Sequence, residues 1–144
     1  MSTLSLLETG ISTGNVKLGD LFDNVKLNGQ HSGNLTLNQL IDLTIVGGWP
    51  SLINKTVSEA RSANVDYLRN VIENDASRLC KGSISKNKLD LVLKSLSRNI
   101  STTVKYSTIV QDVFRFYNEN IANETVADYI QILKNLYIVD EIPA

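Results

Sequence analysis

Glycine and proline are unevenly distributed along this chain. All eight glycines of the 144 residues lie at or before Gly82, and no proline occurs between Pro50 and Pro143. In a helix interior, glycine and proline cost about 1 and 3 kcal/mol relative to alanine. The part after Gly82 therefore lacks helix breakers, and we expect it to be helical. The repeated glycines before position 35 predict an irregular segment over residues 1–35.

Composition places the chain among ordinary globular proteins. Apolar residues make up 42% and charged residues 20% of the sequence, and the formal net charge is −1. The only cysteine, Cys80, rules out an internal disulfide. The first residues lack the basic region of a signal peptide, and no apolar run approaches the ~20 residues of a membrane span. We expect a cytoplasmic location without membrane contact.

Two helices are predicted in a helical segment over residues 36–82. The first begins after Thr36, a good N-cap residue, and ends at Gly47–Gly48. The second begins at Thr56, because Thr56 and Glu59 have the spacing of a capping box, and it ends at Lys81–Gly82. Its apolar side chains recur at helical spacing and predict one buried stripe. The stripe comprises Val57, Ala60, Val65, Leu68, Ile72, Ala76 and Leu79.

Three further helices are predicted between residues 83 and 137. They run from Lys86 to Asn99, from Ser107 to Tyr117 and from Glu124 to Tyr137, with Ser85, Ser107 and Asn123 as N-caps. The apolar side chains at helical spacing are expected to face inward. These are Leu89, Val92, Leu93, Leu96, Ile100, Ile109, Val110, Val113, Phe114, Tyr117, Val126, Tyr129, Ile130, Leu133 and Tyr137.

A short strand over Tyr137–Ile142 is predicted after the last of these helices. Three helices followed by a strand is the element order of a winged helix-turn-helix. The expected fold is therefore mainly α, a helical bundle with a C-terminal winged helix-turn-helix-like part over residues 83–144. The wing is expected to be incomplete, because only its first strand is predicted.

Catalytic motifs are scarce in the sequence. The only histidine, His31, has no recognisable pairing with Cys80, so a hydrolase built on these two residues is the least favoured reading. Glu73 and Asp75, at i and i+2 of a helix, point apart and do not predict a metal site. The glycine-containing segment Gly10–Gly14 lacks the Gly-Lys-Ser/Thr of a P-loop. We expect no enzymatic activity, no cofactor and no nucleotide site.

Basic side chains concentrate between residues 81 and 105. This segment contains six basic residues and one acidic residue, Asp90. Such a segment can contact phosphates, although lysine-rich helix faces are more often simply solvated. On the last helix Gln131 and Asn135 can read an adenine edge, but Glu124 and Asp128 on the same face repel phosphate. A protein partner is therefore favoured, with DNA binding as the alternative. The candidate nucleic-acid contacts are Lys81, Lys86, Lys88, Lys94, Arg98, Lys105, Gln131 and Asn135.

The order of short motifs resembles part of a family of prokaryotic AAA-type P-loop ATPases. The matching segments extend over nearly the whole chain. They are Ser5–Gly14, Val16–Phe22, Leu37–Leu40, Val46–Pro50, Tyr67–Arg69, Glu73–Asp75, Leu93–Asn99, Thr125–Tyr129 and Leu136–Ala144.

Proteins of that family look like a P-loop ATPase domain, a middle winged-helix region and a C-terminal part similar to restriction-endonuclease folds. The resemblance implies that the present chain is the middle piece, with residues 1–35 as the tail of the ATPase-like region. The implied role is non-catalytic: the winged-helix region positions the ATPase against a partner. That partner would be another protein or other parts of the same polypeptide.

Overall fold

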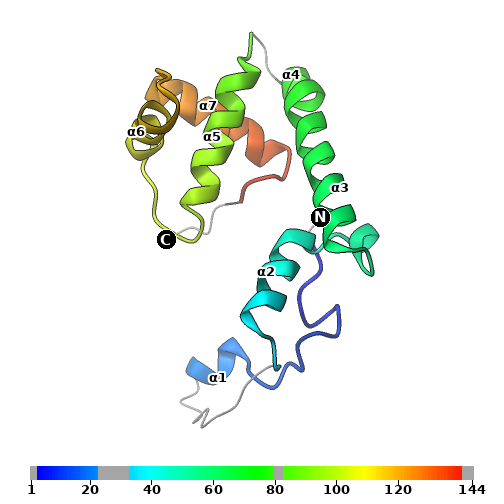
Figure 1. Cartoon of the computed structure of the whole chain (residues 1–144). Helices are drawn as coiled ribbons and strands as arrows, with labels where there is room; N and C mark the ends of the chain where they lie inside the picture. Colours follow the sequence, from blue (N-terminus) through cyan, green and yellow to red (C-terminus); the bar gives the residue numbers. More distant parts are fainter. Residues whose placement is uncertain (1–2, 23–32, 80–82, 141–144) are drawn as a thin grey trace. The chain divides into compact units, whose positions relative to one another are not determined.

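The computed structural model describes residues 3–22, 33–79 and 83–140, and the regular elements in these ranges are helices (Figure 1). The expectation of a mainly α fold is thus confirmed. Backbone contacts divide the chain into two compact units, the first ending at Val65 and the second beginning at Asp66. This boundary falls inside one helix, α3, which extends over Val57–Asn70.

The first unit contains α1 (Leu18–Phe22), α2 (Leu37–Val46), a 3₁₀ turn (Pro50–Leu52) and the beginning of α3. Two hydrogen-bonded contacts connect its segments. The Leu4 amide donates to the Gly48 carbonyl at 2.8 Å, and Asn64 Nδ2 donates to the Ile45 carbonyl at 2.9 Å. The Asn64 amide therefore satisfies a carbonyl in the last turn of α2, where no backbone partner remains.

Both ends of α2 lie where the sequence predicts them. Thr36 Oγ1 accepts a hydrogen bond from the Gln39 amide, and the Gln39 side chain accepts from the Thr36 amide, which completes a capping box. At the other end Gly47 has φ +71°, a conformation that glycine adopts without steric cost. The predicted N-cap and stop of this helix are confirmed.

The Thr56–Glu59 capping box is also present: the Thr56 amide donates to Glu59 Oε2 at 2.9 Å, and the Glu59 amide donates to Thr56 Oγ1 at 3.3 Å. Hydrogen bonds from the side chain and then the backbone of Thr56 lower the pKa of the Glu59 carboxyl below its ordinary 4.5.

The lowered pKa predicts a pH dependence of stability at Glu59. A carboxyl whose pKa falls on folding contributes stability above pH 4.5 and loses that contribution as the pH falls through its folded pKa. Glutamine preserves the capping geometry without titrating. We expect Glu59→Gln to be less stable than wild type at pH 7, with the difference shrinking at pH 3. Thermal unfolding of both proteins at the two pH values measures this, and a constant difference would contradict it.

The long helix predicted from Thr56 contains a π-helical turn. Helix α3 continues into a π turn over Val71–Asp75 and then into α4 (Ala76–Leu79). Across this turn the Ala76 amide donates to the Val71 carbonyl, five residues earlier, so Val71 and Ala76 are both buried. The wider turn shifts the positions that follow it by one residue, and Leu79 of the predicted stripe is about half exposed. Val65, which precedes the turn, is also about half exposed.

The second unit is built on three helices, α5 (Lys86–Arg98), α6 (Tyr106–Tyr117) and α7 (Asn123–Asn135), packed around one core (Figure 1). Ser85 caps α5 as predicted, accepting from the Lys88 amide. The other two predicted caps are wrong by one or two positions. Ser107 lies inside the first turn of α6, and Asn123 is the first residue of α7, so the N-cap positions belong to Lys105 and Ala122.

Most side chains predicted to face inward do so. The fully buried centre includes Leu89, Val92, Ile109, Val113, Val126 and Leu133, all of them predicted. Four predictions are wrong, because Ile100, Phe114, Tyr117 and Tyr137 are exposed. Ile100 lies in the turn after α5. Phe114 lies about 100° further round α6 than the buried Val113, and its ring is 53% exposed.

The predicted strand over Tyr137–Ile142 is wrong where the structure describes it, because residues 137–140 form a turn and an irregular segment. The Tyr137 amide donates to the Lys134 carbonyl and the Ile138 amide donates to the Leu133 carbonyl, which is a Schellman motif at the end of α7. This motif requires a left-handed residue, and Tyr137 has φ +57°. The chain therefore turns where a strand would begin. A winged helix needs strands, and the described residues contain none.

The Schellman motif predicts a stabilising substitution. A non-glycine residue in the left-handed region costs about 1–2 kcal/mol, and the Tyr137 side chain is 82% exposed and buries little in return. We expect Tyr137→Gly to raise the free energy of unfolding by about 0.5–1 kcal/mol. Asn118 is the matched control: it has φ +54°, and asparagine tolerates this region, so Asn118→Gly should change stability less. Urea denaturation of both variants decides, and a loss of stability in Tyr137→Gly would contradict the prediction.

Candidate interaction surface

A buried polar network links α5 to α6. The Ser95 side chain is fully buried, and its Oγ donates to Asp112 Oδ2 at 3.0 Å. Asn99 Nδ2 donates to the same Asp112 oxygen at 3.1 Å and to the Ser95 carbonyl at 2.9 Å. Buried polar groups favour the folded state only when they are paired, and these are. The network therefore fixes the last turn of α5 against the middle of α6.

Arg98 lies beside this network and is held against two aromatic rings. Its guanidinium carbon is 4.6 Å from the centre of the Phe116 ring and 5.6 Å from that of Tyr117. Its Nη1 donates to the Tyr117 hydroxyl at 3.1 Å, and its Nε is 3.9 Å from Asp112 Oδ2. Cation–π contacts of this kind contribute about 0.5–1 kcal/mol at exposed positions. We call Arg98, Phe116 and Tyr117 the Arg98 cluster.

The Arg98 cluster is exposed to solvent. Phe116 is 55% exposed, and the neighbouring Phe114 is 53% exposed. The Arg115 guanidinium carbon adds a second cation 5.7 Å from the Phe116 ring centre. The sequence did single out Arg98, but as one cation among several. The aromatic partners were missed, although residues 114, 116 and 117 cannot all face one side of a helix, which signals that some of them must be exposed.

The predicted phosphate contacts are mostly engaged within the chain. Lys81 lies outside the described residues. Lys88 Nζ donates to the Asn120 carbonyl at 2.8 Å, and Lys94 Nζ pairs with Asp90 at 2.7 Å, a hydrogen bond that raises the pKa of Lys94. Lys86 and Lys105 are exposed, at the first residue of α5 and just before α6. The structure thus places four of these cations on α5, with intramolecular partners for Lys88, Lys94 and Arg98.

The predicted base-reading face of α7 is exposed, as the helical spacing of its polar residues predicted. Glu124, Asp128, Gln131 and Asn135 all lie on solvent-facing positions. Gln131 Nε2 donates to Asn135 Oδ1 at 3.0 Å, so the two amides bond to each other. Gln131 keeps its Oε1 and a second N–H for a base, but the carboxylates of Glu124 and Asp128 on the same face repel phosphate.

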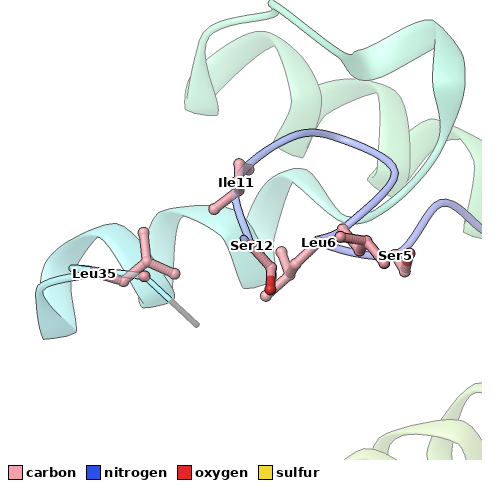
Figure 2. A pocket seen from close by; sticks show the side chains of 7 residues that line it. Ser5, Leu6, Ile11, Ser12 and Leu35 are labelled. Carbon is pink, nitrogen blue, oxygen red and sulfur yellow. The ribbon is translucent and has the colours of Figure 1, made fainter. Parts of the chain in front are cut away.

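The first unit carries a separate apolar pocket of about 420 Å³. Its labelled side chains come from the turn at residues 5–12 and from Leu35, just before α2 (Figure 2). Helix α2 has no buried residue, and its Leu37, Leu40 and Ile41 are about half exposed or more. This unit therefore presents an apolar surface as well.

The residues considered for catalysis lie outside the described ranges, since His31 and Cys80 both fall there. Within the described part of the chain, no three histidine, cysteine or acidic side chains gather as a metal site would require. Among the same residues, no helix is both long enough and apolar enough to cross a membrane.

Comparison with known proteins gives one match. No curated protein and no solved structure matches the chain. A family model described as a domain of unknown function, DUF8612, matches residues 37–144, which include α2 to α7 and the whole Arg98 cluster. The match begins just after the segment expected to be irregular. The chain belongs to the DUF8612 family.

Proposed function

We propose that the chain is a non-catalytic helical module that positions an AAA-type ATPase against a partner protein. The family resemblance of the sequence suggests the ATPase. The observation that carries the docking role is the Arg98 cluster, an exposed pair of aromatic rings with an arginine held against them by a hydrogen bond and cation–π contacts.

The composition of the cluster supports protein contact. Arginine and aromatic residues are enriched at the few positions that dominate protein interfaces. A side chain that is already ordered before binding loses less conformational entropy on association. Arg98 is ordered by its contacts with Tyr117 and Phe116, so the surface is prepared for a partner.

DNA binding through α5 is the second candidate. Lys86, Lys88, Lys94 and Arg98 share this helix, which favours it. Against it, Lys94 and Arg98 already face carboxylates, and affinity for DNA depends on the number of phosphates neutralised. Anisotropy titration with a labelled duplex at low and high salt separates the candidates. Salt-dependent binding would favour DNA, and its absence would eliminate it.

Calorimetric titration of the whole chain with Mg·ATP tests the non-catalytic assignment. We expect no saturable heat, because no P-loop motif occurs in the sequence. Saturable ATP binding by this chain would overturn the proposal. This experiment does not involve the Arg98 cluster, so its result is independent of any partner.

A further inference from the structure

Arg98 retains hydrogen-bonding capacity that its own chain does not use. A guanidinium has five N–H donors. In the described part of the chain Arg98 donates one hydrogen bond, to the Tyr117 hydroxyl. Asp112 Oδ2 already accepts from Ser95 and Asn99, and its 3.9 Å separation from Arg98 Nε is an ion-pair distance beyond hydrogen-bond range. With 35% of its side chain exposed, Arg98 can offer donors to a ligand.

The surroundings of Arg98 favour a ligand that is both anionic and apolar. The Phe116 ring lies against the guanidinium and is more than half exposed. Aromatic surface is stabilised when it is covered by apolar groups, at about 25 cal/mol per Å². A planar oxyanion on Arg98 and an apolar side chain on the Phe116 ring would therefore bind together.

The charge balance favours a carboxylate over a phosphate chain. Asp90 pairs with Lys94 one turn before Arg98, and Asp112 lies directly beside Arg98. These carboxylates reduce the attraction for a polyanion, whose binding requires several unpaired cations. A single carboxylate needs only the bidentate geometry that arginine supplies.

We propose that the Arg98 cluster binds an aspartate or glutamate side chain flanked by large apolar residues, on a segment of a partner protein. Arg98 holds the carboxylate, Arg115 contributes a second positive charge, and Phe116 contacts the apolar residues. This partner chemistry rests on the proposed docking function.

The test is an NMR titration of the whole ¹⁵N-labelled chain with three probes. The first is a blocked pentapeptide whose central glutamate lies between two phenylalanines. The second has glutamine in place of glutamate, and the third is a thymidylate dodecamer. We expect the glutamate peptide to shift the Arg98 Nε–H signal and the amides of residues 114–117 saturably. The glutamine peptide should bind about tenfold more weakly, because it lacks the charge-assisted pair.

Two variants provide the control. Arg98→Lys keeps the charge but loses the planar fork, so we expect about tenfold weaker binding of the glutamate peptide. Lys86→Ala removes a cation from the same helix about 18 Å away, and should leave binding unchanged. Amide spectra of both variants verify that they fold.

Each contrary outcome has a distinct meaning. Equal binding of the glutamate and glutamine peptides at the cluster would overturn the carboxylate proposal and leave the docking function standing. Tighter binding of the thymidylate probe than of the glutamate peptide would overturn the carboxylate proposal in favour of nucleic-acid recognition. If none of the three probes shifts the cluster signals, both the carboxylate proposal and the docking surface are wrong.

Discussion

Replacing Asp112 with alanine is expected to lower the free energy of unfolding by about 3 kcal/mol. The substitution leaves the fully buried Ser95 hydroxyl without its acceptor and removes one of the two acceptors of Asn99 Nδ2. It also removes the carboxylate beside Arg98. Buried donors without a partner cost about 1–3 kcal/mol each. Chemical denaturation followed by circular dichroism measures the loss.

Asp128→Ala is the matched control for Asp112→Ala. Asp128 lies on the exposed face of α7, so its removal should change stability by less than about 0.5 kcal/mol. Ser95→Ala should cost less than Asp112→Ala, since it removes a donor without leaving one unpaired. Equal stabilities of the Asp112 and Asp128 variants would show that the network contributes little.

Replacing Gly48 with alanine is expected to destabilise the first unit by about 3 kcal/mol. A Cβ at this position would lie 2.9 Å from Thr3 Cβ and in hard contact with the Leu4 carbonyl oxygen, and backbone atoms cannot move aside cheaply. The Gly48 carbonyl also accepts the Leu4 amide at 2.8 Å. We therefore expect the N-terminal segment to separate from the residues after α2.

The fluorescence of Trp49 measures this effect, because the chain has a single tryptophan and it lies beside Gly48. Gly19→Ala is the control: a Cβ there meets no atom within 4 Å, and alanine favours the helix α1 in which it lies. We expect a lower denaturation midpoint for Gly48→Ala only. An unchanged midpoint would mean that the close approach of Leu4 and Gly48 does not hold in solution.

Local signals in the sequence predicted the helices well. The N-cap at Thr36, the capping box at Thr56 and the breaker at Gly47 depend on neighbouring residues, so the local sequence alone located three helix ends. The π turn over Val71–Asp75 was not predictable from local spacing, because the burial of Ala76 in the core of the second unit depends on residues far away in the sequence. The prediction of a strand at Tyr137 was wrong for a similar reason. Its β-favouring residues were overridden by the Schellman motif that ends α7.

The candidate site was only half predictable. Arg98 was found through its charge, and its place among the cations of α5 follows from helical spacing. Its stacking on Phe116 and its link to Ser95 and Asp112 depend on how α5 and α6 pack, and no local pattern contains that information. A serine at a core-facing position of α5 was the available signal. A buried hydroxyl needs a partner from another element.

Recognition through the Arg98 cluster would depend on pH through the partner's carboxyl group, which must be ionised to bind. Ionic strength would act differently, since the Debye length is about 8 Å at physiological salt and exposed charges are screened beyond it. Contact at Arg98 would survive physiological salt, whereas attraction from a distance would fade. The Arg98 cluster would accordingly slow the dissociation of a bound partner rather than speed its association.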